Sequence, residues 1–266
     1  MLRRRTRAAD SDWPLKPGLP FIAGHEGIGI VVALGDGVTA VKEGDRVGVP
    51  WLYSACGHCG HCEYCLAARE PVCDQAQFAG CTQNGGFADF IVADLNDVAH
   101  IPPGLAPREA APLICAGVNS DKGLKETQAR PGQWVVVSGV GGLRQLAVQY
   151  ARAMGLRVCA VDVDDDKLAR AKRLEAEVTF NARHPKVLEQ VNPSTGSGAH
   201  GVVARCIMIR GFFVGSRSDM ADALALGARG AVKADIEWQP LAAINSVLQR
   251  LKNGQVPPRV VLEFAA

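Results

Sequence analysis

Five of the nine cysteines in this chain crowd into one short segment, between Cys56 and Cys73. Cys59, Cys62, Cys65 and Cys73 have the spacing C-x2-C-x2-C-x7-C, which lets one loop place four thiolates around a tetrahedral zinc ion at Zn–S distances of about 2.3 Å. Because four protein ligands close such a site to substrate, we expect a structural zinc. Cys56 adds one more step of the same GHC pattern, so a register in which Cys56 replaces one of the four stays open.

Disulfides and a DNA-binding zinc ribbon are the competing interpretations of these cysteines. The basic start of the chain is not followed by the apolar segment of a signal peptide, which favours metal binding over disulfides. A zinc ribbon that binds DNA would carry basic residues around its ligands, and this loop is nearly neutral. We therefore expect a zinc-binding loop in a cytoplasmic protein.

A second chemical segment is the glycine turn that runs from Gly139 to Leu143, which follows a predicted strand and opens a predicted helix. Gly139 permits a tight turn and Gly141 lets the backbone approach a diphosphate, for which the start of the helix supplies free amide donors. We expect Gly142 and Leu143 to belong to the same dinucleotide site. A glycine turn alone is weak evidence, but its position between a strand and a helix strengthens it.

Asp162 ends the next predicted strand, about twenty residues further on, where its carboxylate would accept both ribose hydroxyls and repel a 2′-phosphate. The pair of motifs therefore predicts NAD rather than NADP. The third glycine position of the G-x-G-x-x-G pattern holds Arg144. A side chain there can push the helix away from its strand or reach a phosphate, and we expect strain or a loss of affinity rather than a new contact.

The elements that must position these residues follow two different rhythms. From residue 22 to about 125, short apolar runs alternate with glycine turns, which indicates a mostly β region with strands at 27–35, 44–49 and within 85–102. From residue 132, strands at 133–139, 157–163 and 177–182 alternate with helices at 143–155 and 164–176, which indicates parallel βα units. Beyond a polar loop at 192–201 we expect a helix from near Ser218, a strand at 232–238, a helix at 240–252 and a strand at 259–264.

Composition limits the classes of function. With 266 residues, of which 48% are hydrophobic and 21% charged, the chain is long enough for two modest cores. The net charge of +2 is spread without a basic stripe, so we expect neither nucleic acid nor an anionic membrane as a partner. No apolar run approaches the roughly 20 residues of a membrane span. A small neutral or weakly charged substrate is the better expectation.

The segment GHEGIG begins at Gly24 and continues to Gly35 and Val38. It resembles the signature of the zinc-dependent medium-chain alcohol dehydrogenases. Further motifs follow in the order of that family: the cysteine loop, NGGFADF, PLICAGV and SGVGGL. The resemblance covers about residues 12–203 and about residues 207–264. Within the family, the chain most resembles bacterial members that prefer ethanol or propanol. The resemblance implies an α/β protein in which a GroES-like β domain at 1–125, completed by 232–266, adjoins a Rossmann NAD-binding domain with a doubly wound parallel sheet at 126–231. It also implies a homotetramer.

The resemblance assigns the catalytic residues. It implies that His25 and Cys115 bind a catalytic zinc, with Glu26 beside them as an alternate or supporting carboxylate ligand. Such a zinc would act as a Lewis acid on the alcohol, which delivers hydride to the nicotinamide. Trp13 and Trp51 fall where the family lines a small apolar substrate pocket. Without the resemblance, Trp51 would be interpreted as core.

The resemblance also extends to the cofactor. Lys167 matches a position that contacts the adenosine ribose, and Arg259 matches one that contacts a cofactor phosphate. Without the resemblance, Arg259 would be interpreted as a surface partner on the last strand. The threonine pair that follows the zinc cysteine in the family is replaced here by Asn119 and Ser120, so we expect a changed contact to the nicotinamide.

Two further departures concern whole segments. The family places its first catalytic zinc ligand, a cysteine, shortly before the DWP stretch, and here no cysteine precedes Cys56. The opening β strand of the GroES-like domain is missing too. After Val203, about one and a half βα units are missing, so residues 133–231 are too few for a six-stranded doubly wound sheet. We interpret the chain as a truncated or internally deleted copy with an incomplete Rossmann domain.

Three functions follow from these observations. The leading hypothesis is an NAD-dependent zinc alcohol dehydrogenase that oxidises a short-chain primary alcohol to its aldehyde. A polyol or secondary-alcohol dehydrogenase of the same superfamily is the first alternative, which only the composition of the pocket separates from the leading hypothesis. The second alternative is an inactive member that keeps the structural zinc loop and adenine-nucleotide binding.

Overall fold

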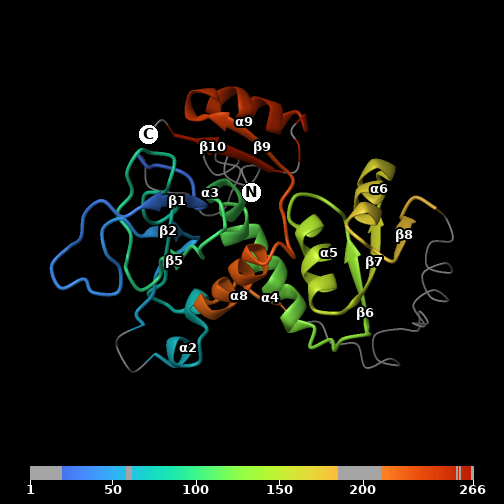
Figure 1. Ribbon diagram of the computed structural model, residues 1–266, viewed down its shortest axis with the longest axis horizontal. Coiled ribbons are helices and arrows are strands. Elements are labelled where there is room, and N and C mark those ends of the chain that lie inside the picture. The colour runs from blue at the N-terminus through green and yellow to red at the C-terminus, as the bar shows by residue number, and fades with distance from the viewer. Residues whose placement is uncertain (1–19, 58–61, 185–210, 256, 258, 265–266) are drawn as a thin grey trace.

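The computed structural model describes residues 20–57, 62–184, 211–255, 257 and 259–264. Figure 1 shows a β-rich region on one side and a parallel sheet with its helices on the other, joined through a central group of helices. The last part of the chain lies across the top of this junction, so segments far apart in the sequence meet near the middle of the molecule (Figure 1).

The β-rich region contains two small antiparallel sheets. Strands β1 (Gly27–Ile30), β2 (Arg46–Val49) and β5 (Ala99–His100) form one sheet in the order β1-β2-β5, and β3 (Leu52–Ser54) pairs with β4 (Gln77–Phe78) in the other. The short helix α2 (Glu63–Leu66) and the 3-10 turn η1 (Glu70–Val72) follow β3. The mostly β character predicted for this half is therefore found, with shorter strands than the sequence suggested.

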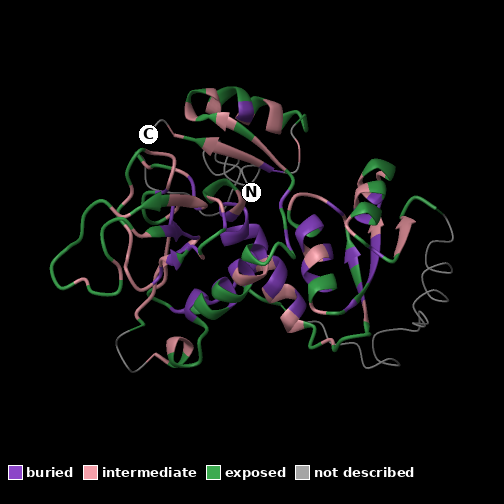
Figure 2. Ribbon diagram, viewed as in Figure 1, coloured by how far each residue is buried: buried purple, intermediate pink, exposed green. Residues whose placement is uncertain are grey.

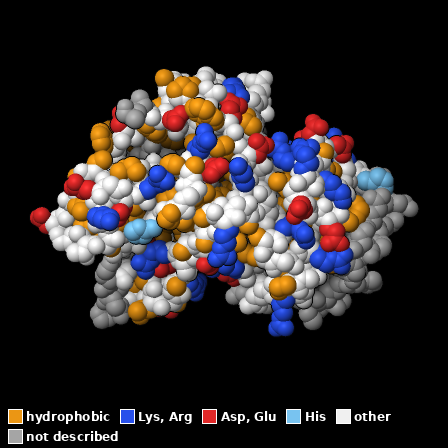
Figure 3. Space-filling model, viewed as in Figure 1, with side chains coloured by type: hydrophobic (Ala, Val, Ile, Leu, Met, Phe, Trp, Pro, Cys, Tyr) orange, Lys and Arg blue, Asp and Glu red, His pale blue; other side chains and the backbone are white. Residues whose placement is uncertain are grey.

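The strand expected within 85–102 is one correction, since only β5 is formed there. Residues 85–87 instead donate three backbone hydrogen bonds to residues 22–24 at 2.7–3.0 Å. Further along, Phe90 and Val92 are 76% and 83% exposed, so the elements in the described part of the chain leave the apolar pattern that suggested a strand uncovered. Figure 3 shows hydrophobic side chains on one face of the molecule, with charged side chains of both signs among them.

The predicted βα units are present on the other side. Strands β6 (Trp134–Ser138), β7 (Arg157–Asp162) and β8 (Val178–Asn181) pair in parallel in that order, and α5 (Arg144–Ala153) and α6 (Asp165–Arg173) connect them. Helix α5 ends before Gly155, which adopts a φ of +74°. Asp164 caps α6 by accepting hydrogen bonds from two backbone amides of its first turn.

This parallel sheet has three strands among the described residues. The polar loop expected at 192–201 and the segment 202–210 lie outside the described part of the chain. The described strands confirm a parallel sheet, while the incompleteness of the Rossmann domain and the placement of the domain boundaries stay predictions.

A central group of helices joins the two sides. It contains α3 (Pro107–Ala110), the π-helical turn η2 (Leu113–Gly117), α4 (Val118–Glu126) and α8 (Arg217–Ala228). Figure 2 shows that buried residues concentrate in these helices and in the strands beside them. The Lys125 ammonium on α4 contacts Asp121 at 2.6 Å, Asp222 at 2.7 Å and Asp219 at 3.1 Å, the last two on α8. The Tyr150 hydroxyl on α5 donates to the Ala223 carbonyl of α8 at 3.0 Å.

The last part of the chain forms a separate unit of strand, helix and strand. Strand β9 (Ile236–Pro240), the 3-10 turn η3 (Leu241–Ala243), α9 (Ile244–Lys252) and β10 (Arg259–Glu263) follow one another, and β10 pairs in parallel with β9. The expected helix at 240–252 therefore opens with a 3-10 turn, and the expected strand at 232–238 begins later. Among the described residues, every helix falls short of the length and apolar character needed to cross a membrane.

Candidate active site

His25 and Cys115 meet although 90 residues separate them, and their Nε2 and Sγ atoms lie 3.1 Å apart. Both side chains are buried, at 5% and 1% exposure. Ligand atoms of His25, Cys115 and the neighbouring Glu26 all lie within 4.8 Å of one another. The structure therefore brings together the three residues that the sequence assigned to a catalytic metal.

Two glycine-rich segments position His25. Gly24 precedes it with a φ of +102°, which an L side chain rarely adopts. A Cβ atom added to Gly85 would lie 2.0 Å from the Gly24 carbonyl oxygen. Because no side chain fits between these backbones, the NGG segment can hydrogen-bond to residues 22–24 and hold His25 against the helix turn that carries Cys115.

A buried arginine sets the electrostatics beside the pair. The Arg259 guanidinium on β10 donates to Glu26 at 3.1 Å and is 7% exposed. Burial by itself would raise the pKa of Glu26, but Arg259 and His25 outweigh it, so the pKa lies below its usual value. Burial and the Glu26 carboxylate raise the pKa of the Cys115 thiol well above its ordinary value.

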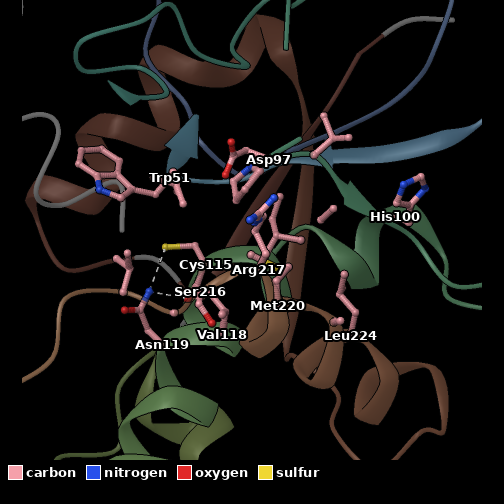
Figure 4. A pocket seen from close by; sticks show the side chains of 18 residues that line it. Trp51, Asp97, His100, Cys115, Val118, Asn119, Ser216, Arg217, Met220 and Leu224 are labelled. Carbon is pink, nitrogen blue, oxygen red and sulfur yellow. Dashed lines mark hydrogen bonds between the residues drawn. The ribbon is translucent and has the colours of Figure 1, made fainter. Parts of the chain in front are cut away.

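An apolar pocket of about 180 Å³ opens beside Cys115 (Figure 4). Its apolar lining includes Leu52, Ile114, Val118, Val214, Met220 and Leu224. Trp51 also lines it, and its ring meets the His25 ring edge-on at 5.0 Å between centroids. On its other side Trp51 stacks on Phe78 at 5.2 Å, and Phe78 contacts Phe213 edge-on at 5.8 Å. Trp51 therefore lines a pocket, and its contact with a substrate stays a prediction.

Polar residues that sequence reasoning missed also line this pocket. Asp97 is buried, and burial raises its pKa to about 6, with Arg217 opposing the rise. Arg217, the first residue of α8, reaches Glu70 at 3.0 Å and the Asn96 carbonyl at 3.2 Å. Figure 4 shows Arg217 below Asp97 and beside Cys115. A local sequence pattern could not predict this contact, because 147 residues separate Arg217 from Glu70.

The two residues that replace the threonine pair have different contacts. Asn119 donates through its amide to the Cys115 carbonyl at 2.7 Å and lines the pocket. The Ser120 Oγ atom lies 2.7 Å from the Ala116 carbonyl oxygen and 3.0 Å from the Leu143 carbonyl oxygen, and its single proton can be donated to either. Ser120 therefore connects α4 with the glycine turn, whereas the Asn119 amide contacts Cys115.

The glycine turn and Asp162 lie against each other, and the predicted contact of Asp162 with a ribose stays a prediction. Gly139 has a φ of +80°, and its amide donates to the Val161 carbonyl at 2.5 Å. The Asp162 carboxylate accepts hydrogen bonds from the Val140 amide at 2.6 Å and the Val163 amide at 2.7 Å. A Cβ atom at Gly141 would meet no atom within 4 Å, which leaves that side of the turn open for a ligand.

Arg144 and Lys167 frame this turn. The Arg144 side chain folds back so that its Nη1 lies 3.1 Å from the place of a Cβ on Gly139. Leu146, two residues into α5, has no exposed surface, so the helix still packs on its strands. The Lys167 ammonium lies 3.2 Å from Asp164 and 3.9 Å from Asp162. Contacts of these residues and of Gly142 with a cofactor stay predictions.

The cysteine loop gathers four thiols, those of Cys56, Cys62, Cys65 and Cys73, whose sulfur atoms lie within 4.8 Å of one another. Three of the four predicted ligands are therefore brought together. Cys59, the fourth, lies outside the described residues, as does Trp13 of the predicted substrate pocket.

Comparisons with known proteins point to one family. The model for the alcohol dehydrogenase GroES-like domain matches residues 5–103, and the model for zinc-binding dehydrogenases matches residues 139–213. An alcohol dehydrogenase of Moraxella sp. is 44% identical over 297 aligned residues, which cover 97% of this chain and 87% of the relative. The chain belongs to the zinc-containing medium-chain alcohol dehydrogenases.

Solved alcohol dehydrogenases share its fold. That of Aeropyrum pernix superimposes with a TM-score of 0.84 at 27% identity, over 98% of this chain and 88% of the other. A structure described as an NAD-dependent alcohol dehydrogenase gives 0.82 at 27% identity, over 94% and 84%. The predicted α/β fold, with a GroES-like and a Rossmann-like part, is confirmed, as is the predicted class of zinc-dependent alcohol dehydrogenase.

The donor atoms of this alcohol dehydrogenase chain fit two zinc ions. A structural zinc takes four protein ligands, which the cysteine loop supplies, and a catalytic zinc takes three and keeps an open position. His25, Glu26 and Cys115 supply three donors beside an open pocket. The alignment to the Moraxella enzyme is longer than the 266 residues of this chain, so positions of that relative have no counterpart here.

Proposed function

We propose that this chain oxidises a short-chain primary alcohol to its aldehyde and transfers the hydride to NAD. The observation that carries the proposal is the buried His25–Cys115 pair, with Glu26 beside it, at the edge of a small apolar pocket. Zinc held by these residues would supply a Lewis acid for the substrate hydroxyl, and NAD would supply the hydride acceptor.

The chain's own residues bind and orient the substrate. Trp51 packs against His25 and, with Val118 and Met220, keeps water from the carbon chain of the alcohol. Pockets for drug-sized ligands measure about 300–1,000 Å³, and this one measures about 180 Å³. Its size therefore favours an alcohol such as ethanol or 1-propanol over a larger polyol. Asn119 holds the Cys115 backbone at the metal side of the same pocket.

The glycine turn and Asp162 support NAD. The turn offers an open face at Gly141 for a diphosphate, and the Asp162 carboxylate at the end of β7 would repel a 2′-phosphate. Lys167 stands beside that carboxylate, where the adenosine ribose would bind. We expect the active form to be a homotetramer, which light scattering on the purified protein would test.

Zinc content and alcohol-dependent NADH formation test the proposal together. We expect two zinc ions per chain, and faster turnover of ethanol and 1-propanol than of 2-propanol. Cys115→Ser should lose one zinc and at least about 100-fold in rate, since even residues that only support a ligand cost about 10–100-fold. Cys81→Ser, a change at a half-buried cysteine outside both metal groups, is the control that keeps both.

Two results would contradict the proposal. Preferred turnover of 2-propanol or a polyol would support the secondary-alcohol alternative. One zinc per chain without turnover of any alcohol would mean that the chain is an inactive member of the family that keeps its structural zinc loop.

A further inference from the structure

Val214 has a strained backbone for which no helix end accounts. Among the described residues, four residues other than glycine have a positive φ. Ala68, Gln128 and Glu175 each follow the C-cap of a helix, where the left-handed conformation is common. Val214 instead comes before α8, and its φ of +45° is strained for a side chain branched at Cβ. Such strain persists only where the surrounding structure holds it, and it concentrates at functional sites.

Val214 lines the apolar pocket, and both of its neighbours in the chain are anchored. The ring of Phe213 meets the Phe78 ring edge-on at 5.8 Å between centroids. Gly215 lies so close to α4 that an added Cβ atom would be 2.3 Å from the Cγ2 atom of Val118. Because the chain is fixed on either side, the Val214 side chain cannot leave the pocket wall without disturbing one of these contacts.

Polar contacts fix the start of α8, two residues further on. Ser216 and Asp219 are both buried and form a capping box at the first turn. The Arg217 guanidinium donates to the buried Glu70 carboxylate at 3.0 Å and to the Asn96 carbonyl at 3.2 Å. The capping box is local to α8, whereas Arg217 joins α8 to the turn η1 of the β-rich region. Arg217 therefore sets where the segment before α8 lies relative to the other side of the pocket.

We propose that Val214 limits the length of the alcohol that the pocket accepts, and that Arg217 is the positioning residue that holds Val214 against the pocket. This inference rests on the proposed function, because it concerns the substrate pocket of that reaction. An aliphatic side chain on a fixed, strained backbone cannot swing away from a longer substrate. The limit should therefore depend on both the size of this side chain and the contact that holds its segment.

Val214→Ala in the full chain tests the size limit. The readout is kcat/KM for ethanol, 1-propanol, 1-butanol and 1-hexanol. The ratio of kcat/KM for 1-butanol to that for ethanol should rise at least about 10-fold, because one methylene in an apolar pocket is worth about 10–200-fold. Val92→Ala, at a valine that is 83% exposed, is the matched control and should keep the wild-type ratio. An unchanged ratio in Val214→Ala would overturn the proposal.

Glu70→Ala tests the positioning role of Arg217. Arg217 itself lines the pocket, whereas its partner Glu70 lies outside the lining, so this variant breaks the contact and leaves the pocket side chains unchanged. The same ratio should rise in Glu70→Ala and in Arg217→Met. Arg229→Met, at the exposed C-cap of α8, is the control and should leave the ratio unchanged. If Glu70→Ala only lowered the melting temperature and kept the wild-type ratio, Arg217 would have no positioning role.

Binding of unreactive ligands separates this inference from the proposed function. Straight-chain carboxamides from acetamide to hexanamide are added to wild type and Val214→Ala, and the shift in melting temperature is measured. Hexanamide should stabilise Val214→Ala more than wild type, and acetamide should stabilise both equally. This shift in a protein that turns over no alcohol would contradict the proposed function alone. Turnover of ethanol without any change in chain-length preference or in the binding of hexanamide would contradict the role of Val214 alone.

Discussion

The Arg259 Nη1 atom lies 3.1 Å from the Oε1 atom of Glu26, although 233 residues separate the two. This contact joins the last strand, β10, to the segment that carries His25. Arg259 is almost fully buried, and about a quarter of the Glu26 side chain is exposed. The last strand thus completes the surroundings of the residues that we propose to be catalytic.

Arg259→Met should destabilise the protein because it leaves a half-buried carboxylate without its partner. Removing one member of a buried pair costs about 3–5 kcal/mol, and the exposure of Glu26 places the expected loss at the low end of that range. Urea unfolding measures it. Arg250→Met is the matched control, since the Arg250 side chain is 37% exposed and its pair with Glu237 is only part-buried, so the loss of stability should be smaller. Equal losses in both variants would contradict the role given to Arg259.

Asp97 should make stability depend on pH. Burial raises its pKa to about 6, so the folded protein binds this proton more tightly than the unfolded chain. The contribution of this proton to the free energy of unfolding is fully present below a pH of about 4. It is lost as the pH rises through about 6, and the loss is at most about 3 kcal/mol. Asp97→Asn should remove this loss. The free energy of unfolding of the variant should therefore rise relative to that of wild type between pH 4 and pH 7.

Urea unfolding at several pH values between 4 and 7 measures this difference. Asp36→Asn, at an exposed turn residue, is the control and should follow the wild-type profile. If Asp97→Asn ran parallel to wild type across this range, the carboxyl group would have no part in the pH dependence.

The sequence could predict those parts of the fold that local patterns encode. The glycine turn, the strand that ends at Asp162 and the helix that follows it all depend on residues close together in the chain. The contact between His25 and Cys115 could be predicted only from the family resemblance, because no periodicity links residues 90 positions apart. For the same reason, local patterns could not predict that Arg217 and Asp97 line the pocket, since long-range packing of α8 brings them together there.

Spacing alone also could not decide between equivalent choices. Four cysteines at three-residue steps, followed by Cys73, satisfy more than one zinc register, and the structure places Cys56 among the other described thiols, two residues after β3. The apolar pattern around Phe90 and Val92 suggested a strand, yet a strand also needs a partner, and residues 85–87 pair with 22–24 instead.

Gly85→Ala should displace His25. Its Cβ atom would lie 2.0 Å from the Gly24 carbonyl oxygen, so the two backbones must separate. Overpacking of this kind costs about 1–3 kcal/mol, and the variant should also bind the second zinc less tightly. Metal content and thermal unfolding measure both effects. Gly29→Ala is the control, because a Cβ there meets nothing within 4 Å. A Gly85→Ala protein with wild-type zinc and stability would contradict this role for the glycine contact.

Arg144→Ala should tighten the binding of NADH. The Arg144 guanidinium folds back over Gly139, two residues from the open face at Gly141 where the diphosphate would bind, so we expect it to crowd that approach. Alanine clears this approach and keeps the helix, because it has the highest helix propensity. Fluorescence titration with NADH measures the dissociation constant, which we expect to fall. Arg152→Ala, further along α5, controls for the loss of one positive charge and should leave the constant unchanged. Weaker binding in Arg144→Ala alone would mean that the guanidinium contacts a cofactor phosphate.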